Sequence, residues 1–190
     1  ELYEYCISKK LNFLTSIFNL SDLDKLENVK IDTIKIPSHE VYNINLINNI
    51  SNLYENVLVS TGAAKWSEIK NITKINNFNK IFFLHCVSSY PCKFEDLNFN
   101  KFKELSKISK NQVGYSGHYQ GIDDAKIAIT LNASYVEKHF TINNDLPGRD
   151  NKFAILPNQL KEISEFININ EKMNLNKNLD LLDGELDIYK

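Results

Sequence analysis

The sequence predicts an α/β fold, and three observations carry this prediction. Six short β-rich runs recur along the chain, with their first residues 21 to 31 positions apart, and segments with helical spacing lie between them. Strands that alternate with helices at this period indicate βαβ units and a parallel sheet. The runs are also apolar along their length, as expected when both faces of a parallel sheet are covered.

The expected strands are residues 12–15 (NFLT), 33–36 (TIKI), 57–60 (VLVS), 81–86 (IFFLHC), 112–115 (QVGY) and 135–140 (YVEKHF). Helices are expected where apolar residues recur at intervals of three and four, in residues 44–53, 99–108, 122–131 and 160–167. Asn43 and Pro157 are typical helix-start residues, as is Ser21 before DLDKLE.

Two architectures fit such a pattern, a doubly wound open sheet and a (β/α) barrel. Polar residues follow nearly every expected strand, which favours the barrel because all carboxyl ends of its strands meet at one mouth. Six strands and 190 residues fall short of the eight strands and roughly 250 residues of a TIM barrel. We therefore expect an incomplete TIM (β/α)8 barrel with strands three to eight present and the first two upstream of Glu1.

We expect residues 1–170 to form this partial barrel domain and residues 171–190 to form a terminal helix or the start of a linker. A net charge of −2 provides no electrostatic footprint for nucleic acid or an anionic membrane. No apolar run approaches the roughly 20 residues of a membrane span. Three cysteines without a CxxC motif argue against a disulfide framework or a zinc ribbon, and a reducing cytoplasmic setting is expected.

His118 and His139 are the first candidates for chemistry, since each follows an apolar run and 21 residues separate them. If the runs are neighbouring parallel strands, the imidazoles emerge at the same rim. Imidazoles favour zinc, manganese, iron or cobalt over calcium, and two of them leave positions open for substrate and water. The alternative is one strand-capping histidine and one satisfied interior histidine. Glu137 shares a face with His139 by strand alternation, where it could serve acid–base work.

A collar of hydroxyl groups with one ammonium group is the second candidate. Lys35 lies between two isoleucines, so it is expected to point into the barrel and to need an anionic partner. Hydroxyls around an ammonium group suit an anion such as phosphate, although serine is also common at strand ends and helix caps. The serines concerned are Ser16, Ser38, Ser60, Ser88 and Ser116.

Two further residues are expected near the mouth. Tyr90 lies at the exit of the fourth expected strand, where its ring could lie across a sugar. The turn LPGRD is expected to project Asp150 back toward the mouth. Glycines flank His118 and follow Ser60 and Thr61, where the backbone must turn tightly or approach a ligand.

Taken together, these segments resemble the sialic acid synthase family, the phosphoenolpyruvate-condensing synthases of nonulosonic acids. The resemblance covers about residues 11 to 165 in family order and spacing. The stretches that carry it are FLTSIF (13–18), KIPSHE (35–40), LVSTGAA (58–64), LHCVSSYP (84–91), GYSGH (114–118), VEKHFT (136–141) and LPGRDNKFAILPNQL (146–160).

The resemblance implies an enzyme that condenses phosphoenolpyruvate with an N-acetylated hexosamine such as N-acetylmannosamine, releasing phosphate, with a divalent ion that is usually Mn2+. It implies that His118 and His139 bind the metal and that Glu137 acts beside them at the catalytic site. Tyr90 and Asp150 would face the sugar. The phosphoenolpyruvate ligands would be Lys35, Ser16, Ser38, Ser60, Ser88 and Ser116.

The resemblance also implies a homodimer in the full-length protein, with a C-terminal antifreeze-like domain that closes the pocket of the partner subunit. One departure is Gly117, where the family usually has an aspartate, and we expect the ion to lack a nearby carboxylate. This departure keeps open a non-catalytic relative that acts as a binding module. Another metal-dependent barrel aldolase or isomerase is a third interpretation. The 190 residues alone are expected to be inactive.

Overall fold

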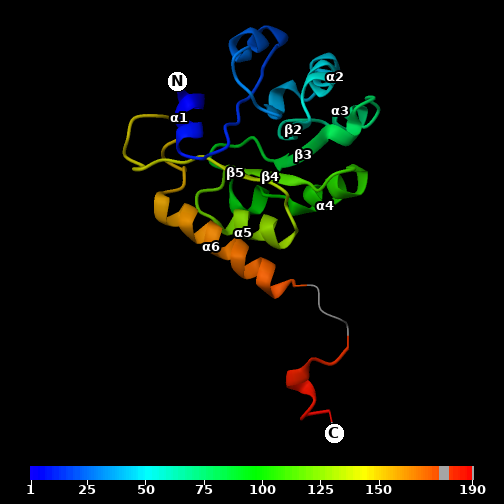
Figure 1. The fold of residues 1–190 in the computed structure, drawn as a ribbon, viewed down its shortest axis with the longest axis vertical. Helices are drawn as coiled ribbons and strands as arrows, with labels where there is room; N and C mark the ends of the chain where they lie inside the picture. Colours follow the sequence, from blue (N-terminus) through cyan, green and yellow to red (C-terminus); the bar gives the residue numbers. More distant parts are fainter. Residues whose placement is uncertain (176–179, 190) are drawn as a thin grey trace.

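A computed structural model describes residues 1–175 and 180–189, and a five-stranded parallel sheet lies at its centre (Figure 1). The strands are neighbours in chain order, and every pairing between them is parallel. They are β1 (Thr33–Ile36), β2 (Asn56–Ser60), β3 (Ile81–Cys86), β4 (Gly114–Gly117) and β5 (Val136–Lys138). A parallel sheet in sequential order is wound in one direction, so its connections share one face.

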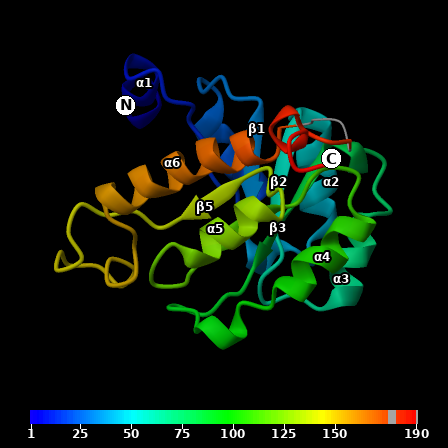
Figure 2. The same ribbon diagram turned by 90° about the horizontal axis from the view of Figure 1, so that it is seen from below.

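Helices connect the strands and form an outer layer (Figure 2). The α-helices are α1 (Leu2–Ser8), α2 (Ile44–Leu53), α3 (Trp66–Ile72), α4 (Phe99–Ile108), α5 (Asp123–Thr130) and α6 (Pro157–Met173). Short 3-10 turns are η1 (Leu20–Leu26), η2 (Ser38–Glu40), η3 (Phe78–Lys80), η4 (Phe94–Asp96) and η5 (Asp183–Glu185). No helix among the described residues is long and apolar enough to cross a membrane.

Local sequence explains where the main helices begin. The side chain of Asn43 accepts a hydrogen bond from the Leu46 N–H at 3.1 Å, which caps the first turn of α2. Pro157 occupies the first turn of α6, where its missing N–H costs no helical hydrogen bond. The apolar residues of α2 then recur at helical spacing, and Leu46, Ile47 and Ile50 are buried against the sheet.

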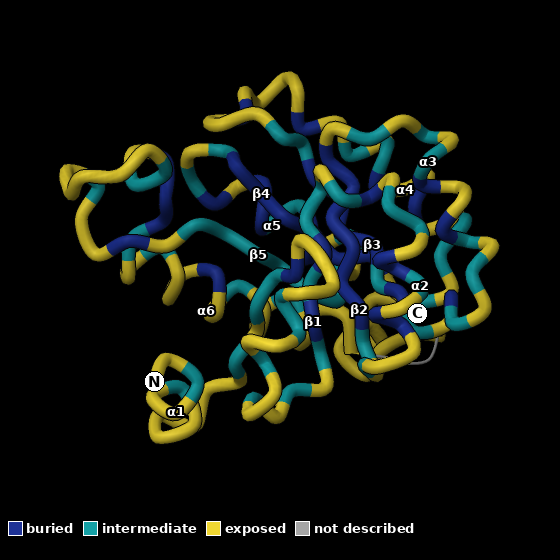
Figure 3. The backbone as a smooth tube through the Cα atoms, turned by 90° about the horizontal axis from the view of Figure 1, so that it is seen from above, coloured by how far each residue is buried: buried dark blue, intermediate teal, exposed yellow. Residues whose placement is uncertain are grey.

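The core lies between the helices and the outer face of the sheet. Alternate strand residues point toward the helices, and this set is almost fully buried. Figure 3 shows the buried residues in dark blue along much of β2, β3 and β4. The outer-face set includes Ile34, Ile36, Val57, Val59, Ile81 and Phe83. Burying this apolar surface supplies the main stabilisation of the fold, at about 25 cal/mol per Å².

The other face of the sheet is concave, and a single ion pair demonstrates its curvature. Lys35 of β1 and Glu137 of β5 belong to the two edge strands, yet Nζ and Oε1 lie 2.5 Å apart. A flat sheet would separate the edge strands by about 19 Å, four inter-strand spacings, which is too far for these side chains to bridge. The five strands therefore form a half-barrel whose inner face carries polar side chains.

The α/β class and the parallel strand order predicted from the sequence are confirmed, with two strands, 33–36 and 81–86, placed correctly to the residue. The expected strand at 12–15 is wrong. Residues 12–15 form no strand, and the next residue, Ser16, makes an isolated parallel bridge with Lys35. The hydrogen bonds of this bridge join Lys35 to Thr15 and Ile17, so no continuous ladder with β1 is formed. The expected strand at 112–115 begins two residues later, and the one at 135–140 shortens to the three residues of β5.

The predicted domain boundary at residue 170 falls inside α6, which continues to Met173. Part of the predicted terminal segment, residues 176–179 and 190, lies outside the described residues. Between these two parts, η5 (Asp183–Glu185) is a short 3-10 turn. The proposed division of the chain at this point stays a prediction.

His85 is a fully buried histidine on the outer face, away from the concave side. Its Nε2 donates to the carbonyl of Leu97 at 2.8 Å, and its ring packs against Phe99, Phe102 and Tyr115. Burial lowers the pKa of His85 to about 4, with a smaller opposing effect from the Leu97 hydrogen bond. The neutral imidazole is therefore the form that packs in the core.

We predict that His85 makes the free energy of unfolding fall as the pH is lowered from 6.5 toward 4. The unfolded chain binds a proton near pH 6.5 and the folded chain only near pH 4. The contribution, about 3 kcal/mol, is therefore complete above pH 6.5 and lost on acidification. Urea unfolding between pH 7 and pH 4 should show a shallower decrease for His85→Gln. The same substitution at the exposed His39 should leave the decrease unchanged, and equal slopes for all three proteins would contradict the prediction.

Candidate active site

A cavity of about 320 Å³ opens on the concave face at the carboxyl ends of the strands. Parallel strands deliver these ends to one rim, which is why residues distant in the sequence meet here. The predicted collar residues that line the cavity are Lys35, Ser38, Ser60, Ser88 and Ser116, together with His118 and Tyr90. Ser16 is paired with Lys35 through the backbone and is not among the residues that line the cavity.

The polar groups of this cavity are only partly satisfied by the protein. Ser38 Oγ accepts a hydrogen bond from the Gly62 N–H at 3.0 Å. Ser60 Oγ is buried and has no hydrogen-bond partner among the described residues. The Lys35 ammonium group lies against Glu137, as its position between two isoleucines predicted. The cavity therefore combines one cation with several hydroxyl groups, a donor set suited to an anionic ligand.

Gly62 allows the cavity walls to approach each other. A Cβ atom on residue 62 would lie 2.9 Å from both Cys86 Sγ and Ser38 Oγ and still closer to Ser88 Oγ. Such distances are shorter than van der Waals contact, so only glycine lets the three side chains surround this point of the backbone.

A second cavity, of about 560 Å³, adjoins the first, and Tyr90 lines both. Its other walls are His139 and the turn that carries Asp150, so this turn does project toward the mouth as predicted. The turn is held in shape by Asn151, whose amide donates to the carbonyls of Leu146 and Pro147 at 3.0 and 3.1 Å.

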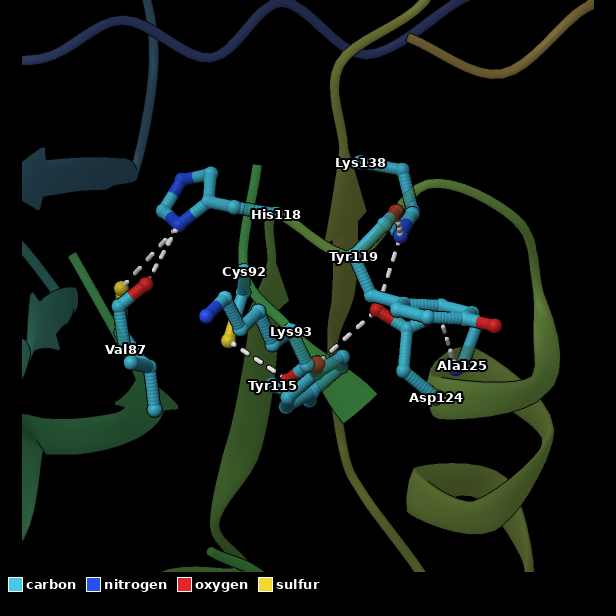
Figure 4. Close-up of polar contacts among 10 residues, drawn as sticks. Val87, Cys92, Lys93, Tyr115, His118, Tyr119, Asp124, Ala125 and Lys138 are labelled. Carbon is cyan, nitrogen blue, oxygen red and sulfur yellow. Dashed lines mark hydrogen bonds and ion pairs between the residues drawn. The ribbon is translucent and has the colours of Figure 1, made fainter. Parts of the chain in front are cut away.

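The two predicted metal ligands lie side by side between the cavities. The ring centroids of His118 and His139 are 5.3 Å apart. Two imidazoles that share one ion at metal–nitrogen distances of about 2.1 Å would place their centroids roughly 4.5–5.5 Å apart. His118 Nδ1 donates to the Val87 carbonyl at 2.8 Å, which leaves its Nε2 available (Figure 4). His139 Nδ1 lies 3.6 Å from Asp150 Oδ2.

The environment keeps both imidazoles uncharged. Burial lowers the pKa of His118, and the Val87 hydrogen bond opposes this only in part. Burial also lowers the pKa of His139, and the neighbouring His118 lowers it further. A metal ligand must offer a free lone pair, so a lowered pKa favours ion binding.

Within residues 1–175 and 180–189, no cluster of three or more histidine, cysteine or acidic side chains is arranged to hold a metal ion. The paired imidazoles therefore fit an ion that takes its other ligands from water, a substrate or residues beyond these ranges. An ion with several open positions is the catalytic type of site rather than the closed structural type.

Aromatic rings hold the histidine pair in place, and the sequence analysis missed one of them. The Tyr90 ring packs on His118 with centroids 4.1 Å apart, and the Phe153 ring packs on His139 at 5.1 Å. Phe153 is buried, and it follows the LPGRD turn by three residues. Its position in that stretch gave no sign that it contacts a histidine, because the stretch is not a strand and has no alternation of side chains from which a face could be predicted.

The expectation about Gly117 requires correction. An aspartate at position 117 would bring a carboxylate near the ion only if its side chain faced the cavity. In β4, however, Ser116 faces the concave side, so Gly117 faces the outer side, where a Cβ atom would collide with Asp124 and Tyr115. Glycine at this position therefore removes no carboxylate from the histidine pair.

Comparison with known proteins identifies the family. A model of the family described as the NeuB family matches residues 1–178. The N,N'-diacetyllegionaminic acid synthase of Campylobacter jejuni is 34% identical over 161 residues, which cover 81% of this chain and 48% of the relative. The pseudaminic acid synthase of Helicobacter pylori is 33% identical over 170 residues, covering 88% and 50%. The chain thus spans about half the length of these relatives.

Solved structures agree with this result. The crystal structure of the N-acetylneuraminic acid synthetase of Leptospira borgpetersenii in complex with citrate superposes with a TM-score of 0.90 at 27% identity. The superposition covers 99% of this chain and 67% of that chain. The half-barrel is therefore similar to a large part of a sialic acid synthetase.

We predict that Gly62→Ala destabilises the protein by about 1–3 kcal/mol, the usual cost of overpacking. The added methyl group would press on the side chains of Ser38, Cys86 and Ser88. Gly184→Ala is a matched control, because a Cβ atom there would meet nothing within 4 Å. Urea denaturation of the three proteins measures the difference, and equal midpoints would show that the cavity walls can move apart freely.

Proposed function

The chain belongs to the NeuB family, and we propose that the full-length protein is a synthase that condenses phosphoenolpyruvate with an N-acetylated hexosamine. The product would be a sialic or related nonulosonic acid for surface carbohydrate biosynthesis, with phosphate released. The observation that carries this proposal is the cavity that places Lys35 and four serines directly beside the paired histidines. On this proposal, an anion site and a metal site would share one mouth, which would bring an enol phosphate and an aldehyde together for condensation.

The full-length protein is proposed to be a closed eight-stranded barrel in which the segment around Ser16 and strands β1 to β5 take positions three to eight. β1 and β5 are the two edges of the half-barrel, and each leaves backbone groups available for another strand. The segment that contains Ser16 already begins to pair with β1. We propose a homodimer in the cytoplasm, as the family resemblance and the sparse, unpaired cysteines indicate.

The collar is proposed to hold phosphoenolpyruvate. Lys35 would pair with its phosphate or carboxylate, and the hydroxyls of Ser38, Ser60, Ser88 and Ser116 would donate hydrogen bonds to its oxygens. Ser16 is retained in this set on the family resemblance alone. These contacts would hold the enol phosphate with C3 directed at the sugar. The bimolecular reaction would then proceed as an effectively unimolecular step between two bound substrates.

His118 and His139 are proposed to hold a divalent ion, most simply Mn2+, and such an ion supplies Lewis acidity at the aldehyde oxygen of the sugar. Tyr90 and Asp150, which line the second cavity, would bind the sugar beside them. The Tyr90 ring offers an apolar face to the sugar ring, and the Asp150 carboxylate accepts hydrogen bonds from its hydroxyls.

Glu137 is proposed to stabilise the charge that would develop during the reaction. Attack of C3 on the aldehyde carbon leaves cationic character at C2, water adds to C2, and phosphate leaves by C–O cleavage. The Glu137 carboxylate faces the cavity side of β5, 2.5 Å from Lys35 Nζ, where it can balance that positive charge and accept the proton of the water. A non-catalytic binding module is no longer favoured, because Gly117 faces away from the site.

We predict that the full-length protein binds Mn2+ through its histidine pair. A His118→Ala, His139→Ala double variant should lose the affinity by about 100-fold or more, since both nitrogen ligands are removed. Free Mn2+ is counted by electron paramagnetic resonance during a titration. His85→Gln, on the other face of the sheet, serves as the control and should bind normally. Unchanged affinity in the double variant would refute the metal site.

We predict that the same full-length protein releases phosphate from phosphoenolpyruvate only when a suitable N-acetylated hexose is present. A panel of such hexoses in a phosphate-release assay tests the substrate class. Lys35→Met should reduce kcat/KM for phosphoenolpyruvate by about 100-fold, because one charged donor to the anion is lost. Lys25→Met, at an exposed lysine, should have no effect. Phosphoenolpyruvate turnover without any sugar would contradict the proposed reaction.

A further inference from the structure

A buried acidic residue lies on the outer side of the sheet, opposite the face that carries the cavity. Asp124, in the first turn of α5, is fully buried (Figure 4). Its Oδ2 accepts hydrogen bonds from the Tyr115 hydroxyl at 2.9 Å and the Lys138 ammonium at 2.7 Å. Its Oδ1 accepts from the Ala125 N–H at 2.8 Å. A carboxylate so completely enclosed is retained only where its partners are fixed.

Glycine at position 117 is what allows this carboxylate to reach its partners. Gly117 pairs with Lys138 in the β4–β5 register. A Cβ atom on residue 117 would overlap Asp124 Oδ2 and would lie 2.9 Å from the Tyr115 ring carbon Cζ. Asp124 therefore occupies the volume that a side chain on β4 would otherwise fill, and it delivers a negative charge there from α5.

Lys138 connects this carboxylate to both segments that carry the histidines. Its side chain is only 4% exposed, and besides Asp124 its Nζ donates to the Tyr119 carbonyl at 2.8 Å. Tyr119 directly follows His118, and Lys138 directly precedes His139. One buried ammonium group thus ties the end of β4 to the end of β5 within a residue of each imidazole.

Because side chains alternate along a strand, the position of Lys138 also determines which way its neighbours in β5 point. Because neighbouring residues of a strand point to opposite faces, holding Lys138 on the outer side obliges Glu137 and His139 to face the cavity. β5 is only three residues long and partly buried, so few other contacts can fix its rotation. The ion pair behind the sheet therefore adds a side-chain constraint to the backbone pairing of β5 with β4.

We propose that Asp124 is a positioning residue for the histidine pair, acting through Lys138 from the face of the sheet opposite the site. The inference rests on the proposed function, since the metal site it supports is part of that proposal. Asp124 touches neither substrate nor ion. It holds the two loops at the spacing that lets both imidazoles share one ion.

The test is the Mn2+ affinity of full-length variants, measured by electron paramagnetic resonance, with circular dichroism as a check of folding. Asp124→Asn keeps the shape but removes the charge, and should weaken Mn2+ binding about 10-fold to 100-fold, as loss of a residue that orients a ligand does. Gly117→Ala should act similarly by displacing the carboxylate. Asp123→Asn, an exposed neighbour in the same helical turn, is the matched control and should bind like the wild type.

A double-mutant cycle separates this role from general loss of stability. If Gly117→Ala and Asp124→Asn act through one contact, the double variant should lose no more Mn2+ affinity than the single variant with the larger loss. If the two substitutions act independently, their fold-losses of affinity should multiply. Multiplying effects would overturn the proposal. Tyr115→Phe removes one hydrogen bond and keeps the ion pair, so it is expected to fold and to weaken binding by less than Asp124→Asn.

The titration of the wild type distinguishes a failure of the proposed metal site from a failure of the positioning role of Asp124. Absence of Mn2+ binding by the full-length wild type would refute the proposed metal site itself. Normal binding by the wild type together with equal affinity in folded Asp124→Asn would overturn the positioning role alone. If Asp124→Asn does not fold, unchanged affinity in Tyr115→Phe and in Gly117→Ala would overturn it.

Discussion

The structure depends on one ion pair across the hollow of the sheet. Lys35 and Glu137 are 102 residues apart and belong to the first and last of the five strands, yet their charged atoms are in contact. This contact is possible only because the sheet curves, and the curvature is what gathers the strand ends into a cavity. The pair also places one positive and one negative group on the concave face of the sheet, and Lys35 lines the cavity. The same two side chains therefore report the curvature of the sheet and contribute opposite charges to its concave face.

Alternation along the strands divides the molecule into two compartments. One set of side chains is mostly apolar and packs beneath the helices, and the other set faces the concave side, where hydroxyl, thiol and charged groups lie with apolar residues such as Leu58 and Leu84. The face that a residue occupies is informative about its role. His85 and His118 belong to adjacent strand segments, yet one is a core residue with a pKa near 4 and the other is a candidate ligand. The face of the sheet on which a histidine lies therefore indicates its role more directly than its neighbours in the sequence do.

The sequence predicted the parallel α/β class and most of the cavity residues, because both follow from the period of the strands. It failed at residues 12–15, which form no strand because only the adjacent Ser16 makes a bridge to β1. It also failed at Gly117, since only the precise start of β4 shows which face that residue occupies. Asp124 gave no signal, because an aspartate in the first turn of a helix is ordinarily a solvent-exposed residue. Side chains that act from behind a sheet are found from packing, which the sequence does not display.

The succession of Glu137, Lys138 and His139 has a consequence for how the chain finds its native pairing. A slip of one residue in β5 would turn Lys138 inward against Lys35 and turn Glu137 outward toward Asp124. Like charges would then meet on both sides of the sheet at once, in surroundings that water screens poorly. A misaligned strand is thus rejected by repulsion on two faces, while the correct alignment gains attraction on both. The charges of three consecutive polar residues therefore help to fix the register of β5, a strand too short for apolar packing alone to fix it.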